Sequence, residues 1–498
     1  MKALFKKIDK FMCGGTKILY TCMMAIVVAI CIFCSGGDYY LKKNFQYANW
    51  MNVVLGIILV GLIFGLCLCL VRCLDKKRIS TKTYHRIILG LNVLLGVYMF
   101  VSAYQYYFKT GWDAEVIINA ASAIAHGQYN GDLDFYFSRC DNNVVIALLY
   151  AVVIKIGSIL PFGNDYFYLV MFQCFVLAYS GYMLYLTVEA FTGKAYTAVA
   201  AWIVYVILMG MSPWVVLPYS DVLALFFLVT LLYLYKTEKM PVLFGVLTII
   251  GFNVKPTVLI LLIAMILLEF PKRWVQLLIG LLVGGVCVWG CIKLSPIDIN
   301  GEKRLGVSHY LMLGLNDETD GVFSEDDLTF SESFQTNAER DAANWQEAMN
   351  RLKEMGFSGL IDQWKNKVLI TFNDGSFAWG VEGGFFKELL YSGNEKLRDL
   401  YRQFFMPDGM YYMYFLSVCQ IVWMGSLGWC LWALLRCADK KILVLGMTII
   451  GVTLFEILFE PRARHLIIYL PVFFTLTAAG FENVKSIIMG QMERGVKK

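Results

Sequence analysis

Charged residues are scarce in this sequence. Only 16% of its 498 residues are charged, whereas 58% are hydrophobic, and the mean hydropathy is +0.61. A chain of this composition has more apolar side chains than one water-soluble core can bury, so a soluble globular protein is excluded. The net charge of +5 is not a sign of nucleic-acid binding, and no nucleic-acid partner is expected. In a membrane protein the positions of the basic residues matter more than their sum.

Several enzyme signatures are also missing. We find no G-x-x-x-x-G-K-[ST] phosphate loop, Rossmann fingerprint, zinc-ligand pattern or G-x-S-x-G, so nucleotide hydrolysis and serine chemistry have no support in the sequence. No internal repeat or duplicated broken helix is present, which argues against a transporter built from inverted repeats. The 14 cysteines lie mostly within apolar runs, and Cys140 is the only one expected outside the bilayer. No disulfide framework is predicted.

Long apolar runs are what the sequence has instead. Runs of roughly 16–22 residues recur along the chain, the length needed to cross a hydrocarbon core of about 30 Å, and they predict an all-α polytopic membrane protein with about twelve transmembrane helices. No small-residue cleavage site follows the first run, so it is expected to be retained as a span. The predicted spans lie near residues 18–33, 53–71, 87–105, 166–190, 196–211, 221–236, 241–253, 257–270, 274–294, 411–435, 442–459 and 465–480.

The basic residues predict which turns face the cytoplasm. The most basic loop is RCLDKKRISTKTYHR (72–86), and positively charged loops stay on the inner side. All the later basic turns also fall inside if the apolar run 144–160 lies in the outer leaflet without crossing. We therefore expect a plasma-membrane protein with both termini cytoplasmic. The later inner turns contain Lys194, Lys236, Lys239, Lys272, Arg273, Lys440 and Lys441.

Four regions follow from this topology. Residues 1–84 hold two N-terminal transmembrane helices and the basic cytoplasmic loop. Residues 85–294 form the transmembrane core, with a first outer loop at 106–143. Residues 295–410 form an acidic, partly helical extracytoplasmic segment, and residues 411–498 hold the C-terminal helices and a basic tail.

Polar residues in the first outer loop are candidates for a site. Asp113 and Glu115 follow the third span, while Arg139, Asn142 and Asn143 precede the run 144–160. Charges beside membrane spans are costly and tend to face water or a polar cavity. An ordinary solvated loop is the alternative interpretation.

Other polar residues are expected on the same face of the membrane. Asp221 heads a helix after Tyr219, and such an acid can also simply complement the helix dipole. Lys255 lies in Asn-Val-Lys-Pro (253–256), where the proline breaks a helix and indicates a polar cavity. Arginines on the outer side run against the positive-inside rule, which weakens their interpretation as interfacial anchors. Together these residues predict a site for an anionic headgroup that also includes Arg462, Arg464 and His465.

Two outer stretches mix aromatic residues, glycines and hydrogen-bonding groups. They are SHYLMLGLN (308–316), which contains His309, and FNDGSFAWGVEGGFF (372–386). This composition suits a carbohydrate-binding face, but aromatic residues also gather at membrane interfaces whatever the function. Both interpretations remain open at this point.

The order and spacing of these segments resemble the GT-C glycosyltransferases, which include protein O-mannosyltransferases, lipid A aminoarabinose transferases and oligosaccharyltransferase catalytic subunits. The chain is most similar to the protein-mannosyltransferase-like membrane enzymes of Gram-positive bacteria. The resemblance covers roughly residues 85–480 and leaves out the first two spans. It is carried by WDAEVI (112–117), YFSRCDNNVVIALLYAVVIKIG (136–157), LPYSDVLALFFLVTLLYLY (217–235), NVKPTVLILLIA (253–264), SHYLMLGLN (308–316) and RHLIIYLPVFF (464–474).

The resemblance implies transfer of a sugar from a polyprenyl-phosphate donor to an extracytoplasmic glycan, lipid or protein. Asp113 matches the family's catalytic acid, the base that deprotonates the acceptor. Arg139 matches a basic residue near the lipid phosphate, although relatives commonly have a lysine before prolines where this chain has Cys-Asp-Asn-Asn. Asp221 matches an acid that holds a metal in oligosaccharyltransferases, but those enzymes have an acidic pair and this chain has Ser220. No cofactor is therefore expected, and a divalent metal is not expected either.

The chemistry of such a transfer agrees with these residue types. An inverting transfer needs one carboxylate as base, and Arg139, Lys255, Arg462 and Arg464 are the cations that could stabilise the departing phosphate. The same cations are expected to hold the pKa of Asp113 low. A flippase or transporter of lipid-linked sugars would share the basic cavity without needing this base. A polymer ligase of the same superfamily is the third alternative.

Overall fold

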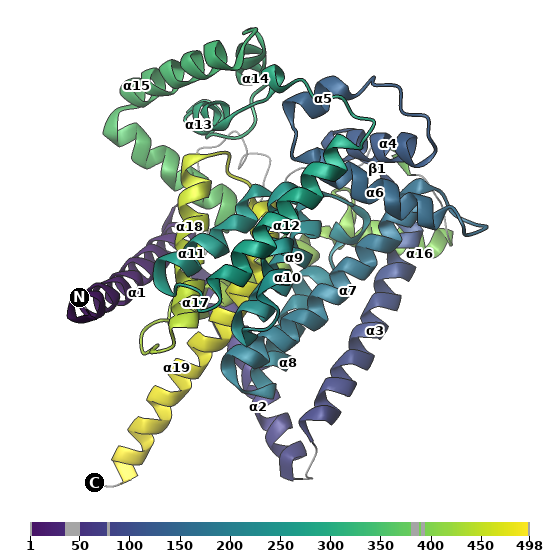
Figure 1. Cartoon of the computed structure of the whole chain (residues 1–498). Helices are drawn as coiled ribbons and strands as arrows, with labels where there is room; N and C mark the ends of the chain where they lie inside the picture. The colour runs from purple at the N-terminus through teal and green to yellow at the C-terminus, as the bar shows by residue number, and fades with distance from the viewer. Residues whose placement is uncertain (1, 35–49, 77–79, 380–387, 390–393, 497–498) are drawn as a thin grey trace.

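The computed structural model describes residues 2–34, 50–76, 80–379, 388–389 and 394–496. Within these residues the chain is almost entirely helical (Figure 1), apart from one antiparallel pair of two-residue strands, β1 (Phe108–Lys109) and β2 (Glu388–Leu389). Helices satisfy their backbone hydrogen bonds internally, which a bilayer requires because it offers no water to do so. Nine helices of the described part are long and apolar enough to cross a membrane. The predicted class, an all-α polytopic membrane protein, is confirmed.

These nine helices coincide with nine of the twelve predicted spans. The other three predicted spans are shorter apolar helices of about 20–24 Å at 1.5 Å per residue, below the roughly 30 Å of a hydrocarbon core. The short ones are α8 (Ala195–Tyr205) continued by η2 (Val206–Gly210), α10 (Pro241–Val254), and η4 (Pro256–Val258) continued by α11 (Leu259–Leu268). The long ones are α1 (Lys2–Phe33), α2 (Trp50–Lys76), α3 (Thr81–Tyr106), α7 (Asp165–Thr192), α9 (Ser220–Thr237), α12 (Trp274–Lys293), α17 (Tyr412–Cys430), α18 (Lys440–Leu458), and η7 (Ala463–Tyr469) continued by α19 (Leu470–Val496).

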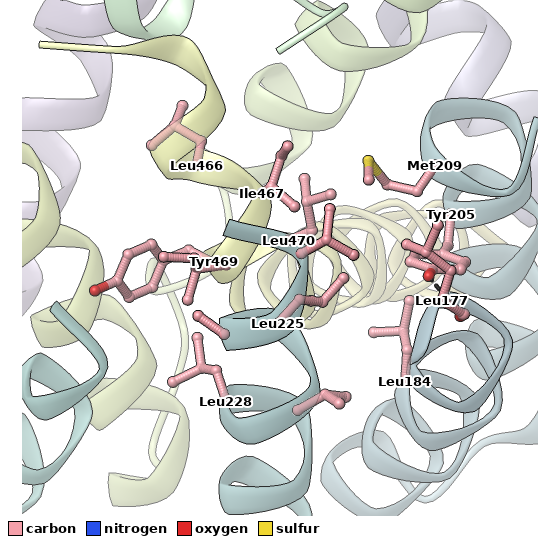
Figure 2. Packing of buried hydrophobic residues seen from close by; sticks show 14 of the residues in the cluster. Leu177, Leu184, Tyr205, Met209, Leu225, Leu228, Leu466, Ile467, Tyr469 and Leu470 are labelled. Atoms are coloured by element: carbon pink, nitrogen blue, oxygen red, sulfur yellow. Dashed lines mark hydrogen bonds between the residues drawn. The ribbon is translucent and has the colours of Figure 1, made fainter. Parts of the chain in front are cut away.

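The centre of the bundle is formed by α7, α9 and the η7–α19 helix. Figure 2 shows their apolar side chains meeting those of α8 and η2, with Leu225 of α9 near Leu470 at the centre of the view. The Tyr205 hydroxyl satisfies its own hydrogen-bonding need by donating to the carbonyl of Leu177 at 2.7 Å. Outer helices such as α2, α3 and α12 instead leave many leucine, isoleucine and valine side chains exposed, as a lipid-facing surface would. The start of α9, preceded by η3 (Pro213–Val216), is buried, since every residue from Ser220 to Leu225 is buried.

The break predicted at residues 253–256 is confirmed. Helix α10 ends at Val254, Lys255 has extended backbone angles, and η4 begins at Pro256. Pro241 and Phe270, at the two ends of this unit, line the same pocket. The segment 241–270 is therefore a helical hairpin that enters and leaves at one end of the bundle, with Lys255 at its tip.

Helix α6 (Asn143–Gly157) begins and ends at one end of the bundle. At its start Asn143 donates to the Tyr136 hydroxyl, and after its end Asn164 donates to the hydroxyl of Tyr107, which directly follows α3. Between them, Lys155 donates to the carbonyl of Ala125, the last residue of α4 (Asp113–Ala125). This geometry agrees with the prediction that residues 144–160 do not cross. Figure 1 groups α4, α5 (Asp134–Arg139) and α6 at the end that also carries α13–α15.

The segment predicted to be a partly helical extramembrane unit does contain helices. They are η5 (Gly301–Lys303), α13 (Val307–Gly314), α14 (Glu325–Glu332), α15 (Asn337–Phe372) and α16 (Glu395–Phe405). Helix α15 begins with a capping box between Thr336 and Glu339 and bends at Gly356, whose φ is 61°. Such a positive φ suits a residue without a Cβ.

The aromatic stretch 372–386 does not provide an exposed carbohydrate face in its described part. Phe377 and Trp379 are fully buried, and the Trp379 indole donates to the carbonyl of Phe405 at 2.8 Å. These rings are part of the core, so the interpretation of residues 372–379 as a carbohydrate-binding face is wrong. Residues 380–386 lie outside the described residues.

Three of the later turns that were predicted to be cytoplasmic also come together, whereas Lys194 pairs with Glu482 of α19. Lys441 contacts Glu238 at 2.7 Å, Lys272 contacts the same carboxylate at 3.6 Å, and Lys236 contacts Asp439 at 2.9 Å. These residues meet at the C-terminal end of α9, whose last turn contains Lys236. At 1.5 Å per residue, its 18 residues place them about 27 Å from the start of that helix.

Candidate active site

Four chain segments meet at the end of the bundle where α9 begins. They are the start of α4, the start of α9, the tip of the α10–α11 hairpin, and the link between α18 and η7. Tyr469 of η7 donates to the carbonyl of Thr257 in η4 at 2.6 Å, which ties the last two segments to each other. Segments far apart in the sequence therefore bring their charged residues to one place.

Asp221 organises the cations of this site. Its side chain is only 1% exposed, and it accepts a hydrogen bond from the Lys255 ammonium. Its second carboxylate oxygen lies 3.4 Å from Nε of Arg464. A buried charge is tolerated only when it is paired, so Asp221 holds two cations in fixed positions. The helix-dipole interpretation of Asp221 is compatible with this role but is not sufficient to explain it.

Arg464 lies between two aromatic rings. Its guanidinium carbon is 5.0 Å from the centre of the Trp112 ring and 5.6 Å from that of Tyr219. The two rings pack edge to face with centres 4.7 Å apart. Because Trp112 directly precedes Asp113, this cation–π contact places the start of α4 beside the start of α9.

The link between α18 and η7 has its own network of charged and polar groups. Glu456, which is 2% exposed, accepts the backbone N–H of Arg462 at 3.1 Å and lies 3.1 Å from Nδ1 of His465. Glu460 accepts from Nε of Arg462 at 2.8 Å. Burial alone would raise the pKa of Glu460, but the charges of Arg462 and Arg464 outweigh it and hold that pKa below its usual value.

Asp113 is different because its charge is not paired. The half-buried carboxyl forms no hydrogen bond or ion pair with any residue that the structure describes. Burial raises its pKa, and the attraction of Arg464, Arg139 and Arg462 only partly offsets that effect. The expectation that nearby cations hold this pKa low is therefore wrong. Removal from water has the larger effect, and each of these arginines also contacts another carboxylate of the protein.

The residues predicted around Arg139 make their described contacts with protein groups other than the cluster of Asp221, Lys255 and Arg464. Arg139 contacts Glu332 of α14 at 2.6 Å and so joins the first outer loop to the outer unit. Asn143 donates to the Tyr136 hydroxyl at 2.7 Å, and Asn142 donates to the Asn143 side chain at 3.0 Å. These amides bond within the protein and hold Tyr136, a neighbour of Asp113, in place.

Two predicted residues lie apart from the cluster. Glu115 interacts electrostatically with Tyr166 of α7. His309 is buried, and its Nδ1 lies 2.7 Å from the Ser331 hydroxyl inside the outer unit. Burial lowers the pKa of His309 to about 4, so the ring is neutral at physiological pH and unsuited to binding an anion.

The site also contains residues that sequence reasoning missed. Glu456 gives a usable signal, because a carboxylate inside an apolar run usually serves a site. Lys367 of α15 gives none, because its partners are about 90 residues away in sequence. Its ammonium donates to the carbonyls of Ile457 and Phe459, and burial lowers its pKa to about 7. Trp112 belongs to the WDAEVI stretch, and its ring contact with Arg464 depends on the tertiary fold.

No group of three or more histidine, cysteine, aspartate or glutamate side chains in the described part of the chain could hold a metal ion. Asp221, the acid that corresponds to a metal ligand in the resemblance, contacts Lys255 and Arg464 instead. The positive charges that the described side chains offer to an anionic ligand here are those of Lys255, Arg462 and Arg464.

The comparison with protein families shows to which family the chain belongs. A family described as conserved hypothetical integral membrane proteins matches residues 8–485. The chain belongs to this family. Its integral membrane character agrees with the helices described above, and the matched region includes every residue of the site as well as the first two spans. Neither the comparison with curated proteins nor that with solved structures gave a match.

Proposed function

We propose that this integral membrane protein is a GT-C-type glycosyltransferase that moves a sugar from a polyprenyl-phosphate donor to an acceptor outside the cytoplasm. The observation that carries the proposal is the contrast between two carboxylates at one end of the bundle. Asp221 is buried and holds two cations, whereas Asp113 beside them has no partner among the described residues and a raised pKa. A base next to fixed cations is what transfer from a lipid phosphate requires.

In the proposed reaction, the acceptor hydroxyl attacks the anomeric carbon of the sugar and its proton passes to the Asp113 carboxylate. The bond between that carbon and the phosphate oxygen breaks, and its electron pair leaves with the lipid phosphate. The configuration at the anomeric carbon is inverted. Arg464, Lys255 and Arg462 stabilise the charge that develops on the phosphate.

The α10–α11 hairpin supports a lipid-linked donor. Its arms are about 20 Å long, shorter than a hydrocarbon core of about 30 Å, so the tip lies within the depth of the bilayer. A cation at that depth is costly unless it faces a polar site. Lys255 at the tip is therefore suited to meet the phosphate of a lipid whose chain stays in the membrane.

A flippase of lipid-linked sugars would use the same cations but would not require Asp113 to act as a base. A polymer ligase would use the same chemistry with a larger donor. The unpaired state of Asp113 favours a transferase over a flippase.

The test replaces this one carboxyl. Asp113→Asn keeps the size of the side chain and should reduce sugar transfer by ~10²-fold or more, the usual scale of general-base catalysis. The assay is transfer in liposomes from radiolabelled polyprenyl-phosphate hexoses and pentoses to envelope acceptors, with donor binding measured separately. Donor binding should persist.

Glu115→Gln is the matched control, because it removes a carboxylate two residues away that lies toward α7. It should retain most of the activity. Normal transfer by Asp113→Asn would remove the base from the proposal and favour the flippase. If the proposal holds, comparing the envelope glycans of a deletion strain with those of the wild type would identify the acceptor.

A further inference from the structure

The pocket lined by Pro241 and Phe270 lies at the opposite end of α9 from Asp221. It encloses about 690 Å³, part of it open to solvent, between the α9–α10 turn, the α11–α12 turn and the start of α18. The length of α9, 18 residues at 1.5 Å each, separates it from the candidate active site by about 27 Å. The proposed transfer reaction makes no use of it.

Positive charge dominates the polar part of this pocket. Four cations line it, Lys239, Lys272, Arg273 and Lys441, against two carboxylates. Glu238 is contacted by Lys441 and Lys272, and these contacts lower its pKa, so it remains ionised. Glu269 accepts a hydrogen bond from the Tyr235 hydroxyl at 2.8 Å. Lys239 and Arg273 form no ion pair with any residue in the described ranges, and both are exposed.

The α9–α10 turn holds Lys239 in position. The residues on either side of it, Glu238 and Met240, have φ values of 54° and 53°. Left-handed backbone at two residues that are not glycine is strained and persists only where the surroundings enforce it. Pro241, at the first position of α10, and the Glu238–Lys441 contact provide that restraint. Lys239 is thus presented by a rigid turn.

The floor and the entrance of the pocket are apolar. Phe244, Met265 and Leu277 form part of its lining. At the entrance Phe270 is 64% exposed, and the adjacent Trp274 is 51% exposed. Along α11 and α12 the neighbouring leucine, isoleucine and valine side chains are exposed as well, so the pocket opens beside a lipid-facing surface.

We propose that this pocket binds an anionic phospholipid, with its phosphate at Lys239 and Arg273 and one acyl chain along Phe244, Met265 and Leu277. Basic pockets between transmembrane helices favour anionic headgroups, and the apolar floor suits an acyl chain. A soluble phosphate compound would contact the cations but would leave the floor uncovered. The site is independent of the proposed transferase activity.

The experiment uses the full chain in mixed detergent micelles and counts bound lipids by native mass spectrometry. The probes are phosphatidylglycerol and phosphatidylcholine with the same acyl chains. The wild type should bind phosphatidylglycerol in preference. Lys239→Gln combined with Arg273→Gln should reduce phosphatidylglycerol affinity roughly tenfold or more, because each basic residue near a phosphate contributes separately. Both residues are exposed, so the variant should fold, and circular dichroism checks this.

The matched control is Arg72→Gln combined with Lys76→Gln, which removes one arginine and one lysine from exposed positions in the last turns of α2. It should keep the preference for phosphatidylglycerol. An equal loss in both double variants would show a general charge effect and overturn the proposal. So would an unchanged preference in the Lys239 and Arg273 variant. Glycerol 1-phosphate alone should not raise the melting temperature. A rise equal to that with phosphatidylglycerol would identify a soluble ligand and likewise reject the lipid.

Discussion

At the scale of single residues, the aspartates in the first turns of α4 and α9 show how the surroundings give two similar side chains different roles. Both lie in the first turn of a helix, where a negative charge is favourable. Asp221 is fully buried and paired with Lys255 and Arg464, whereas Asp113 is half-buried and unpaired within the described chain. The first carboxylate fixes the positions of cations, and the second remains available to accept a proton.

The raised pKa of Asp113 predicts the pH dependence of the proposed transfer. Only the ionised carboxylate can act as base, so kcat/KM should fall as the pH decreases through this pKa, above the usual aspartate value of 3.8. Arg464→Gln removes the cation that lowers this pKa most and should move the acid limb to higher pH. A pH profile of transfer measures both effects.

Glu115→Gln is the control for that profile and should leave the acid limb in place. A limb that stays unchanged in Arg464→Gln would show that another group limits the rate at low pH. The position of the limb decides this prediction, because Arg464→Gln also lowers the maximal rate.

Replacing arginine by lysine separates the roles of Arg464 and Arg139. Arg464→Lys keeps the charge but loses the planar contact with Trp112 and Tyr219, so donor affinity should fall roughly tenfold. Arg139→Lys should alter donor affinity much less, because Arg139 contacts Glu332 of the outer unit, whereas Arg464 contacts Asp221, which also holds Lys255. Donor binding measured for both variants tests this. Equal losses would mean that Arg139 also contacts the phosphate.

At the scale of elements, the α10–α11 hairpin brings Lys255 to the site, and its packing against α12 depends on glycine. A Cβ on Gly280 would lie 2.1 Å from the carbonyl oxygen of Val242, and one on Gly245 would lie 2.5 Å from that of Leu277. Small residues allow helices to approach this closely in membranes, where dispersion contacts hold them together. The position of Lys255 therefore depends on a contact in the arms of the hairpin.

Gly280→Ala should consequently destabilise the protein by roughly 1–3 kcal/mol, the usual cost of overpacking. Gly285→Ala lies on the same helix with nothing within 4 Å of its added Cβ, so it should be neutral or slightly stabilising. Thermal unfolding in detergent measures the difference. The same melting temperature for both variants would show that the two helices can separate at no cost.

At the scale of the whole molecule, charge is distributed between two ends of one bundle. Three of the later basic turns meet each other beside α18, and the site with its outer unit lies at the other end of α9. Positively charged turns are retained in the cytoplasm, so the site is predicted to face outward.

Single cysteines test this orientation. In a chain whose accessible native cysteines are replaced, Lys239→Cys should react with a membrane-impermeant thiol reagent only from the inside, and Asp326→Cys only from the outside. Ser158→Cys, just after α6, should react from the outside because both ends of α6 lie at the same end of the bundle. Labelling of Lys239→Cys and Asp326→Cys from one side would contradict the orientation, and inside labelling of Ser158→Cys would mean that α6 crosses.

Much of the architecture could be predicted from the sequence, because each of its signals is local. An apolar run long enough to span a bilayer must be helical whatever its neighbours are, and a Lys-Pro pair breaks a helix through its own backbone. The spans, the break at Lys255 and the helices of the outer unit therefore followed from short stretches. The convergence of Asp221, Lys255 and Arg464 could be inferred only as a shared membrane face.

The tertiary structure alone decided how these residues interact. The partners of Arg139, His309 and Lys367 come from distant segments, and no local pattern encodes which carboxylate or carbonyl will meet a given cation. The pKa of Asp113 depends on how far the fold removes it from water, which outweighs the number of arginines nearby. Burial and pairing are properties of the packed molecule. The sequence by itself determined the helices and the break at Lys255, and packing determined which residues meet at the site and which of them remain available for chemistry.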